Sequence, residues 1–217
     1  MQNFLESEIF HAISPESIRK LQQLPVALLS YPAKELVRQQ GSPLSDFMII
    51  KKGCLKVCEF MIDGKEIVSS YYFEGDGFPL YLHFGDVHVF PYNVFTVYRS
   101  DVYFLPLADL EAIIRSDPVF MENVLRFVAR YTCFNKLILR STQYNRVNQR
   151  LAYWLLNLDQ VDAYKMPSTQ EMLADLLHVN RSTLNQELKK LETLKVIEIN
   201  GMDLRVLNPD YLESLIT

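Results

Sequence analysis

The chain has 217 residues, of which 49% are hydrophobic and 22% charged, and its formal net charge is −4. This composition is typical of a globular protein of one or two domains, and the negative charge argues against a generic basic coat for nucleic acid. No apolar run is long enough to span a membrane, the N-terminus lacks the regions of a signal peptide, and the three cysteines have no zinc-type spacing. We therefore expect a reduced, cytoplasmic protein.

Residues 31–106 predict several short strands separated by turns. Turn signals such as Lys52-Gly53 and Asp63-Gly64 recur at roughly ten-residue intervals, as in all-β folds. The expected strands are 47–50, 55–60, 66–71, 92–97 and 102–105. Strands at this spacing make a β-barrel or roll. The aromatic residues concentrated in 71–104 supply its core, and some of them could line an apolar pocket.

From Asp117 onward the pattern becomes helical, with Pro118 in the first turn. Six apolar residues then follow at spacings of 4, 3, 4, 3 and 4, which is a heptad seam that a two-stranded coiled coil would bury. This predicts a homodimer whose interface is Phe120, Val124, Phe127, Tyr131, Phe134 and Ile138. The alternative is that part of the stripe packs on the protein's own β-roll, although Leu125 and Val128 offer a second apolar face for that purpose. Residues 140–143 break the stripe and predict a hinge, and a further helix is expected over 146–158.

Residues 168–191 predict two helices joined by a short turn. Ser168 followed by Glu171 fits a capping box at the start of the first helix, and Asn180 is a preferred N-cap for the second. His178 occupies a turn position that favours positive φ, where histidine is enriched. The inward-facing residues expected at helical spacing are Leu173, Leu176, Leu177, Leu184, Leu188 and Leu191. This arrangement is a helix-turn-helix, which makes double-stranded DNA the leading candidate partner.

Two short, largely apolar segments, 196–199 and 204–207, flank Asn200-Gly201, a strong hairpin signal. A hairpin directly after the second helix predicts a winged helix-turn-helix. The plainer alternative is an αα-hairpin and a β-hairpin that only fill space. Because residues 146–217 are themselves slightly acidic, affinity for DNA would have to come from a local face that includes Arg150, Arg181, Lys189 and Lys190.

Taken in order, these segments resemble the catabolite-activator (CRP/FNR) family of bacterial transcription regulators. The resemblance covers nearly the whole chain. It is carried by residues 47–53, Asp63-Gly64-Lys65-Glu66, Gly75-Asp76 and Pro106 in the roll, and by residues 179–184, Leu188 and Leu191-Glu192 in the DNA-binding part. It implies an α+β chain in three parts. Residues 1–116 would form a β-roll sensor domain with N-terminal helices, similar to cyclic-nucleotide-binding jelly rolls. Residues 117–142 would form a dimerisation helix and hinge, and residues 143–217 a winged helix-turn-helix.

The resemblance also implies a sensor without the usual ligand. Cyclic-nucleotide pockets in this family use a Phe-Gly-Glu turn and an Arg-Ser/Thr pair, whereas the matching segments here are Phe78-Pro79-Leu80 and Phe90-Pro91-Tyr92. A buried phosphate without a cation is strongly disfavoured, so we expect no cAMP or cGMP binding. The pocket candidates are Phe78, Leu80, Phe90 and Tyr92, for an apolar or aromatic effector or none at all.

Other cofactors are also not expected. Residues 1–30 lack the cysteines that hold an iron–sulfur cluster in oxygen-sensing members of the family. His83 and His88 stand without further clustered ligands, which disfavours a metal site or haem. Cys54 and Cys58 are expected to be buried small side chains rather than a redox pair.

By position, the resemblance makes Arg181, Ser182 and Gln186 the base-reading residues, with arginine suited to guanine and glutamine to adenine. Family members commonly carry an acidic residue at position 182 and arginine at position 186, so we expect a different operator. The expected phosphate contacts are Ser168, Thr169, Gln170, Lys189 and Lys190.

RNA polymerase would be a further partner if the protein is an activator. The alternative function is a ligand-binding module whose helix-turn-helix serves protein contacts, and no motif of an enzyme is found.

Overall fold

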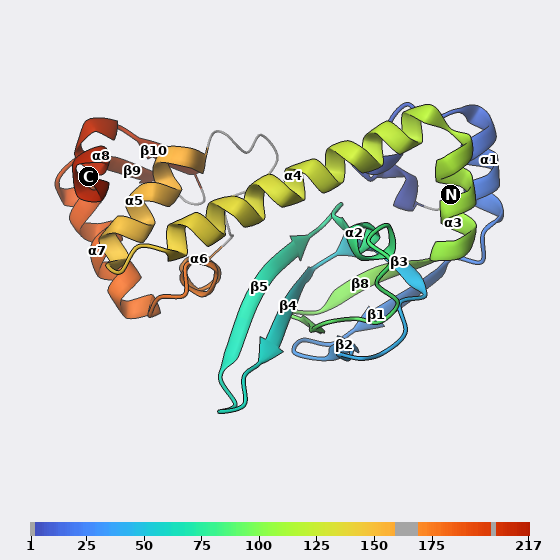
Figure 1. Cartoon of the computed structure of the whole chain (residues 1–217), viewed down its shortest axis with the longest axis horizontal. Coiled ribbons are helices and arrows are strands. Elements are labelled where there is room, and N and C mark those ends of the chain that lie inside the picture. Colours follow the sequence, from blue (N-terminus) through green and yellow to red (C-terminus); the bar gives the residue numbers. More distant parts are fainter. Residues whose placement is uncertain (1–2, 159–168, 201–202) are drawn as a thin grey trace. The chain divides into compact units, whose positions relative to one another are not determined.

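The computed structural model describes residues 3–158, 169–200 and 203–217. The chain divides into two compact units, Met1–Val128 and Ala129–Thr217, and one long helix, α4 (Pro118–Thr142), runs through the boundary between them. Figure 1 shows the helices and strands of both units. No helix among the described residues is long and apolar enough to cross a lipid bilayer.

The first unit begins with short helices and continues with a β-roll. Its helices are η1 (Asn3–Glu6), η2 (Glu8–Phe10), α1 (Pro15–Gln23), α2 (Leu80–His83), α3 (Leu107–Ser116) and the first part of α4. Its strands are β1 (Ala27–Tyr31), β2 (Leu36–Arg38), β3 (Asp46–Lys52), β4 (Cys54–Phe60), β5 (Glu66–Phe73), β6 (Gly77–Phe78), β7 (Asn93–Thr96) and β8 (Ser100–Pro106).

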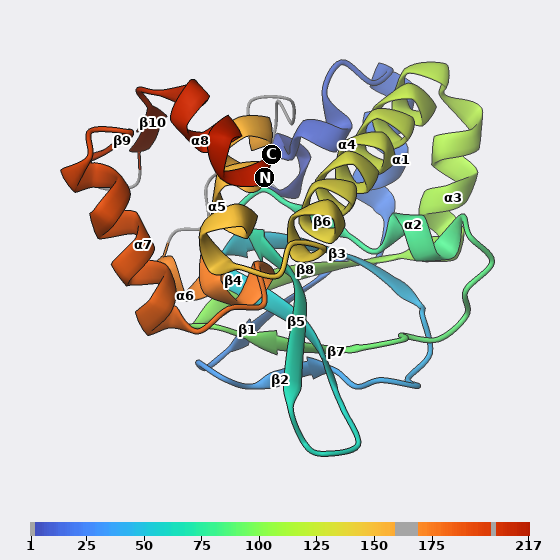
Figure 2. The same cartoon turned by 60° about the vertical axis from the view of Figure 1, so that its left-hand side comes forward.

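The strands form two four-stranded antiparallel sheets, in the orders β1-β8-β3-β6 and β2-β7-β4-β5. Figure 2 shows the long β4–β5 hairpin together with the strands of both sheets. The predicted roll is confirmed, and the five predicted strands agree with β3, β4, β5, β7 and β8 to within two residues at each end. Gly53 and Gly64, in two of the predicted turns, adopt φ of 110° and 81°, a backbone region that glycine enters at little cost.

One core of the first unit lies between the β1-β8-β3-β6 sheet and the helices. Side chains of β3 and β8, such as Phe47 and Leu105, pack there with residues from η1, η2, α1 and α3. Phe120 and Val124, from the first turns of α4, are fully part of this core. Figure 1 shows α1, α3 and the beginning of α4 side by side.

A buried carboxylate, Asp117, joins α1 to the start of α4. One of its oxygens accepts hydrogen bonds from the Ser14 backbone N–H and the Ser17 hydroxyl, at 2.8 and 2.7 Å. The other accepts the backbone N–H groups of Val119 and Phe120, so Asp117 caps α4. Burial alone would raise the pKa of Asp117, but the hydrogen bonds from Ser17, Ser14 and Phe120 hold it well below its ordinary value.

The second unit contains the rest of α4, then α5 (Val147–Asn157), α6 (Gln170–Leu176), α7 (Arg181–Thr193), β9 (Ile197–Asn200), β10 (Asp203–Val206) and α8 (Pro209–Ile216). The predicted helix over 146–158 is confirmed as α5, and the predicted hinge falls where α4 ends at Thr142. Helix α8, which contacts α5, was missed by the sequence analysis. Its signal was present, because Asn208 is the N-cap and Pro209 occupies the first turn.

Candidate nucleic-acid interface

A helix-turn-helix lies within the second unit, where α6 packs against α7. The turn between them contains His178 with φ of 52°, so the predicted positive φ at this residue is confirmed. Val179, also in the turn, is half-buried. The leucines predicted to face inward are all buried: Leu173, Leu176, Leu177, Leu184, Leu188 and Leu191.

The N-cap of α6 differs from the prediction by one residue. The Thr169 hydroxyl accepts the Met172 backbone N–H at 3.2 Å, which makes Thr169 the N-cap. The predicted N-cap is therefore one residue too early, and Ser168, the partner of Glu171 in the predicted capping box, lies outside the described residues. Glu171 instead approaches Arg181, with 3.8 Å between its Oε2 and the Arg181 Nη1.

Arg150 of α5 holds the turn of the helix-turn-helix. Its Nη1 donates hydrogen bonds to the carbonyl oxygens of Leu177 and His178, at 2.9 and 3.1 Å. Its Nε donates to the carbonyl oxygen of Tyr144 at 2.7 Å. A cation at the C-terminal end of a helix satisfies carbonyl groups that have no partner within the helix. The guanidinium of Arg150, which the sequence analysis placed on the DNA-binding face, thus forms hydrogen bonds within the protein.

The start of α7 is capped by Asn180, as predicted. Its Oδ1 accepts both the backbone N–H and the hydroxyl of Ser182, at 2.9 and 2.7 Å. The Ser182 hydroxyl therefore donates its proton to Asn180, and the lone pairs of its oxygen can still accept a hydrogen bond from another group.

The predicted base-reading residues Arg181, Ser182 and Gln186 are all exposed on α7. Lys189 and Lys190 are exposed farther along the same helix, with the Lys190 Nζ 4.0 Å from a Glu187 carboxylate oxygen. The remaining predicted phosphate contacts that the structure describes, Thr169 and Gln170, are exposed at the start of α6. The ion pair between Glu171 and Arg181 shows that the first turns of α6 and α7 are close together.

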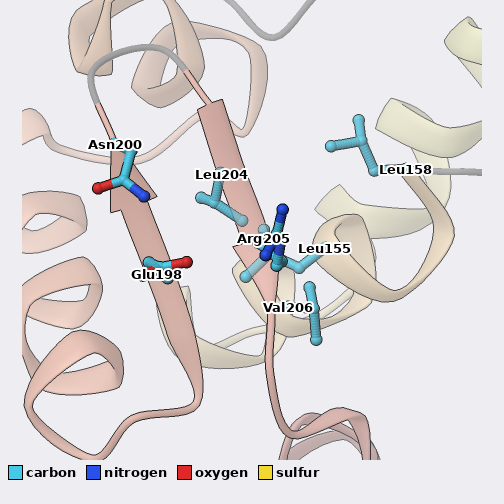
Figure 3. Close-up of a pocket in the computed structure, with 7 residues that line it drawn as sticks. All are labelled: Leu155, Leu158, Glu198, Asn200, Leu204, Arg205 and Val206. Carbon is cyan, nitrogen blue, oxygen red and sulfur yellow. The ribbon is translucent and has the colours of Figure 1, made fainter.

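The wing is confirmed, with β9 and β10 paired antiparallel. Asn200 pairs with Asp203 and therefore belongs to β9 rather than to the predicted turn, whereas Gly201 lies outside the described residues. A cavity of about 390 Å³ lies between the wing and the end of α5. Figure 3 shows its lining: Leu155 from α5, Leu158 directly after that helix, and Glu198, Asn200, Leu204, Arg205 and Val206 from the wing.

The stripe predicted as the dimer seam is partly used inside the chain. Phe120 and Val124 belong to the core of the first unit, and Phe127 packs against that core. The dimer prediction is therefore wrong for Phe120 and Val124, and the alternative that part of the stripe packs on the protein's own roll unit is confirmed. Phe134 is buried as well, while Tyr131 and Ile138 are half-buried.

A different face of α4 is exposed. Leu125 and Leu139 are 62% and 61% exposed, which reverses the role that the sequence analysis gave to Leu125. The exposed residues at alternating spacings of four and three, the outer face of α4, are Leu125, Ala129, Thr132, Lys136 and Leu139. This spacing is that of a coiled-coil seam, but on a different side of the helix from the predicted one.

The four candidate pocket residues of the roll, Phe78, Leu80, Phe90 and Tyr92, are all buried. Phe78 stacks on Tyr72 with 4.1 Å between ring centroids, and Phe90 meets Tyr92 edge to face. A cavity of about 570 Å³ lies elsewhere in the first unit, lined by η1, β3, β8 and the β5–β6 turn.

The thiols and imidazoles lie in ordinary surroundings. Cys54 and Cys58 are buried, as predicted, and burial raises the pKa of each to about 12. His83 pairs with Glu111 at 2.8 Å, and hydrogen bonds from Arg115 and His83 lower the pKa of Glu111. Among the described residues, no three His, Cys, Asp or Glu side chains cluster as metal ligands would.

Comparison with known proteins identifies both parts of the chain. Residues 28–117 match the family model of the cyclic nucleotide-binding domain, and residues 149–215 match the Crp-like helix-turn-helix domain. No curated protein sequence matches the chain.

Several solved structures share the fold over almost the full length. A CooA mutant from Carboxydothermus hydrogenoformans has 16% identity and a TM-score of 0.71, covering 100% of this chain and 95% of its own. FixK2 from Bradyrhizobium japonicum has 16% identity and a TM-score of 0.68, with 89% and 98% covered. The catabolite activator protein of Thermus thermophilus has 22% identity and a TM-score of 0.52, with 97% and 98% covered. With a β-roll, a long helix and a winged helix-turn-helix in this order, the chain belongs to the CRP/FNR family of transcription regulators.

Proposed function

We propose that this protein is a homodimeric regulator that binds a palindromic DNA operator through α7 of each subunit, in the cytoplasm where that DNA lies. The observation that carries the proposal is the exposed start of α7, where Arg181, Ser182 and Gln186 share one surface on a helix capped by Asn180. A helix that enters the major groove reads base edges with residues near its N-terminus.

The three side chains differ in what they can read. The Arg181 guanidinium offers donors that match the O6 and N7 acceptors of guanine, and Gln186 can bond adenine at two positions. Because the Ser182 proton is directed to Asn180, the Ser182 oxygen would act as an acceptor. It therefore favours a base with an exposed amino group, adenine or cytosine. Thr169, Gln170, Lys189 and Lys190, together with Ser168, would contact phosphates.

Dimerisation would use the outer face of α4. Leu125 and Leu139 are large apolar side chains left in solvent, and the heptad spacing between them suits a second copy of the same helix. Two copies place two α7 helices on one duplex, which doubles the contacts of a slightly acidic domain.

The effector of the roll, if there is one, would be apolar or aromatic. Leu80 and Tyr92 stand where the family's cyclic-nucleotide pockets carry a glutamate and an Arg-Ser/Thr pair, so we expect the roll to bind neither cAMP nor cGMP. We propose neither haem nor an iron–sulfur cluster as its cofactor. A ligand that binds the folded roll raises its melting temperature, so a thermal-shift screen would find one. Interaction with RNA polymerase is proposed only for the case of an activator.

The test begins with selection of fragments of the organism's genome on the purified protein, followed by titration of the selected duplex at several salt concentrations. Binding through phosphates requires a steep fall of affinity with salt. Arg181→Ala should weaken operator binding about 10- to 100-fold and relax preference at one position per half-site. Equal losses on operator and scrambled DNA would make Arg181 a phosphate contact only. Binding that does not depend on salt would favour the alternative, a ligand-binding module with a helix-turn-helix for protein contacts.

A further inference from the structure

Glu171 places a carboxylate beside the first residue of the recognition helix. It is the second residue of α6, and its Oε2 lies 3.8 Å from the Nη1 of Arg181. Both side chains are largely exposed, at 67% and 69%, so the pair faces the same solvent that DNA would displace. Thr169, rather than Glu171, supplies the N-cap of α6.

The contact leaves Arg181 able to bind a partner. A guanidinium has five N–H donors, and one ion pair through Nη1 engages only part of them. An exposed pair of this kind contributes little to folding stability. Its effect on binding is larger, since the approach of DNA removes water and strengthens every remaining charge interaction.

A carboxylate at this place acts differently on the two kinds of DNA contact. A backbone phosphate carries a full negative charge, so Glu171 repels it from Arg181. The acceptor atoms of guanine belong to a neutral base, so the same repulsion is much weaker when Arg181 reads a base edge. A repulsive element directed against the wrong contact increases specificity even when it lowers total affinity.

We propose that Glu171 is a specificity-determining positioning residue, which orients Arg181 toward base edges and keeps that side chain from binding phosphates. The inference rests on the proposed DNA-binding function, because it assigns a role within the same surface. Glu171 itself need not touch DNA.

The experiment compares full-length wild type and Glu171→Gln on the selected operator and on a scrambled duplex of equal length, over a series of KCl concentrations. For each subunit that contacts the duplex, Glu171→Gln should bind scrambled DNA about five-fold more tightly, the upper range for one exposed charge pair, and the operator less than about two-fold more tightly. The salt dependence on scrambled DNA should steepen by up to about one unit of log–log slope per subunit, since one more phosphate can be neutralised.

Two controls separate this role from a general change of charge. Glu192→Gln removes the same charge from an exposed position at the other end of α7 and should leave the ratio of the two affinities unchanged. In an Arg181→Ala background, Glu171→Gln should no longer change that ratio, because its effect passes through Arg181.

The outcomes are distinguishable. Equal tightening on both duplexes, the same result from Glu192→Gln, or an undiminished effect without Arg181 would each overturn the role of Glu171 while leaving DNA binding intact. Wild type that shows no salt-dependent binding to any duplex would overturn the proposed function, and this inference with it. Thermal melts of each variant check that the fold is retained.

Discussion

Replacing Arg150 by methionine tests whether this side chain holds the helix-turn-helix together. Methionine keeps the apolar stem but removes three hydrogen bonds from the guanidinium to the carbonyl groups of Tyr144, Leu177 and His178. A hydrogen bond to a charged group contributes about 1.5–3 kcal/mol. Two of the three share Nη1 and one is exposed, so water can replace part of the interaction. We therefore expect the free energy of unfolding of the second unit to fall by about 2–3 kcal/mol in total.

The chain provides a selective reporter for this measurement. Its single tryptophan, Trp154, is fully buried in α5, within the second unit. Urea unfolding followed by tryptophan fluorescence should show a midpoint lowered by about 2 M, if the slope is about 1–1.5 kcal/mol/M for a unit of this size. Arg146→Met is the matched control, because Arg146 is exposed near the start of the same helix. A midpoint shift below about 0.5 M, or one no larger than that of the control, would refute the reasoning.

Two further predictions concern the first unit and the dimer. Asp117→Asn should cost the first unit about 2 kcal/mol, since the amide group cannot accept all four hydrogen bonds. Because the pKa of Asp117 is lowered in the folded state, its stabilisation is present above a pH of about 4 and is lost as the pH falls further. Urea unfolding followed by near-ultraviolet circular dichroism at pH 7 and pH 3 should show a smaller acid loss for the variant, and an equal loss would contradict the assignment. Leu125→Glu places like charges on the outer face of α4 in both copies and should raise the dimer Kd at least about ten-fold in sedimentation experiments, whereas Ala112→Glu on α3 should not. An unchanged Kd for Leu125→Glu would exclude that face.

Features set by a few adjacent residues could be predicted from the sequence. Gly53 and Gly64 mark tight turns because their φ is positive, and His178 enters the same region for the same reason. Asn180 caps α7 with a side chain that reaches only two residues along the chain. Such local chemistry depends little on the rest of the fold, so strands, the turn and the recognition helix follow from the residues themselves.

Features that depend on distant contacts could not be predicted. Two of the four hydrogen bonds to Asp117 come from residues about a hundred positions earlier, and Arg150 bonds carbonyl groups of the turn that follows α6. Which of the two apolar faces of α4 is buried also depends on contacts with distant parts of the chain. Phe120 and Leu125 are both large and apolar, and only the packing of the first unit decides that Phe120 is buried and Leu125 exposed. The N-cap of α6 was misplaced by one residue because Ser168 and Thr169 are both good caps.

Two of the three cysteines are buried and one is exposed, so a thiol reagent can label the chain selectively. Thiol reagents attack the thiolate, and Cys54 and Cys58 are buried with a pKa of about 12, so they stay protonated and shielded. Cys133 is exposed on α4, next to Thr132 of its outer face. A fluorophore or spin label would therefore enter the unmodified sequence at a single position. In a dimer, the distance between the two labels at Cys133 would measure how closely the two α4 helices approach each other.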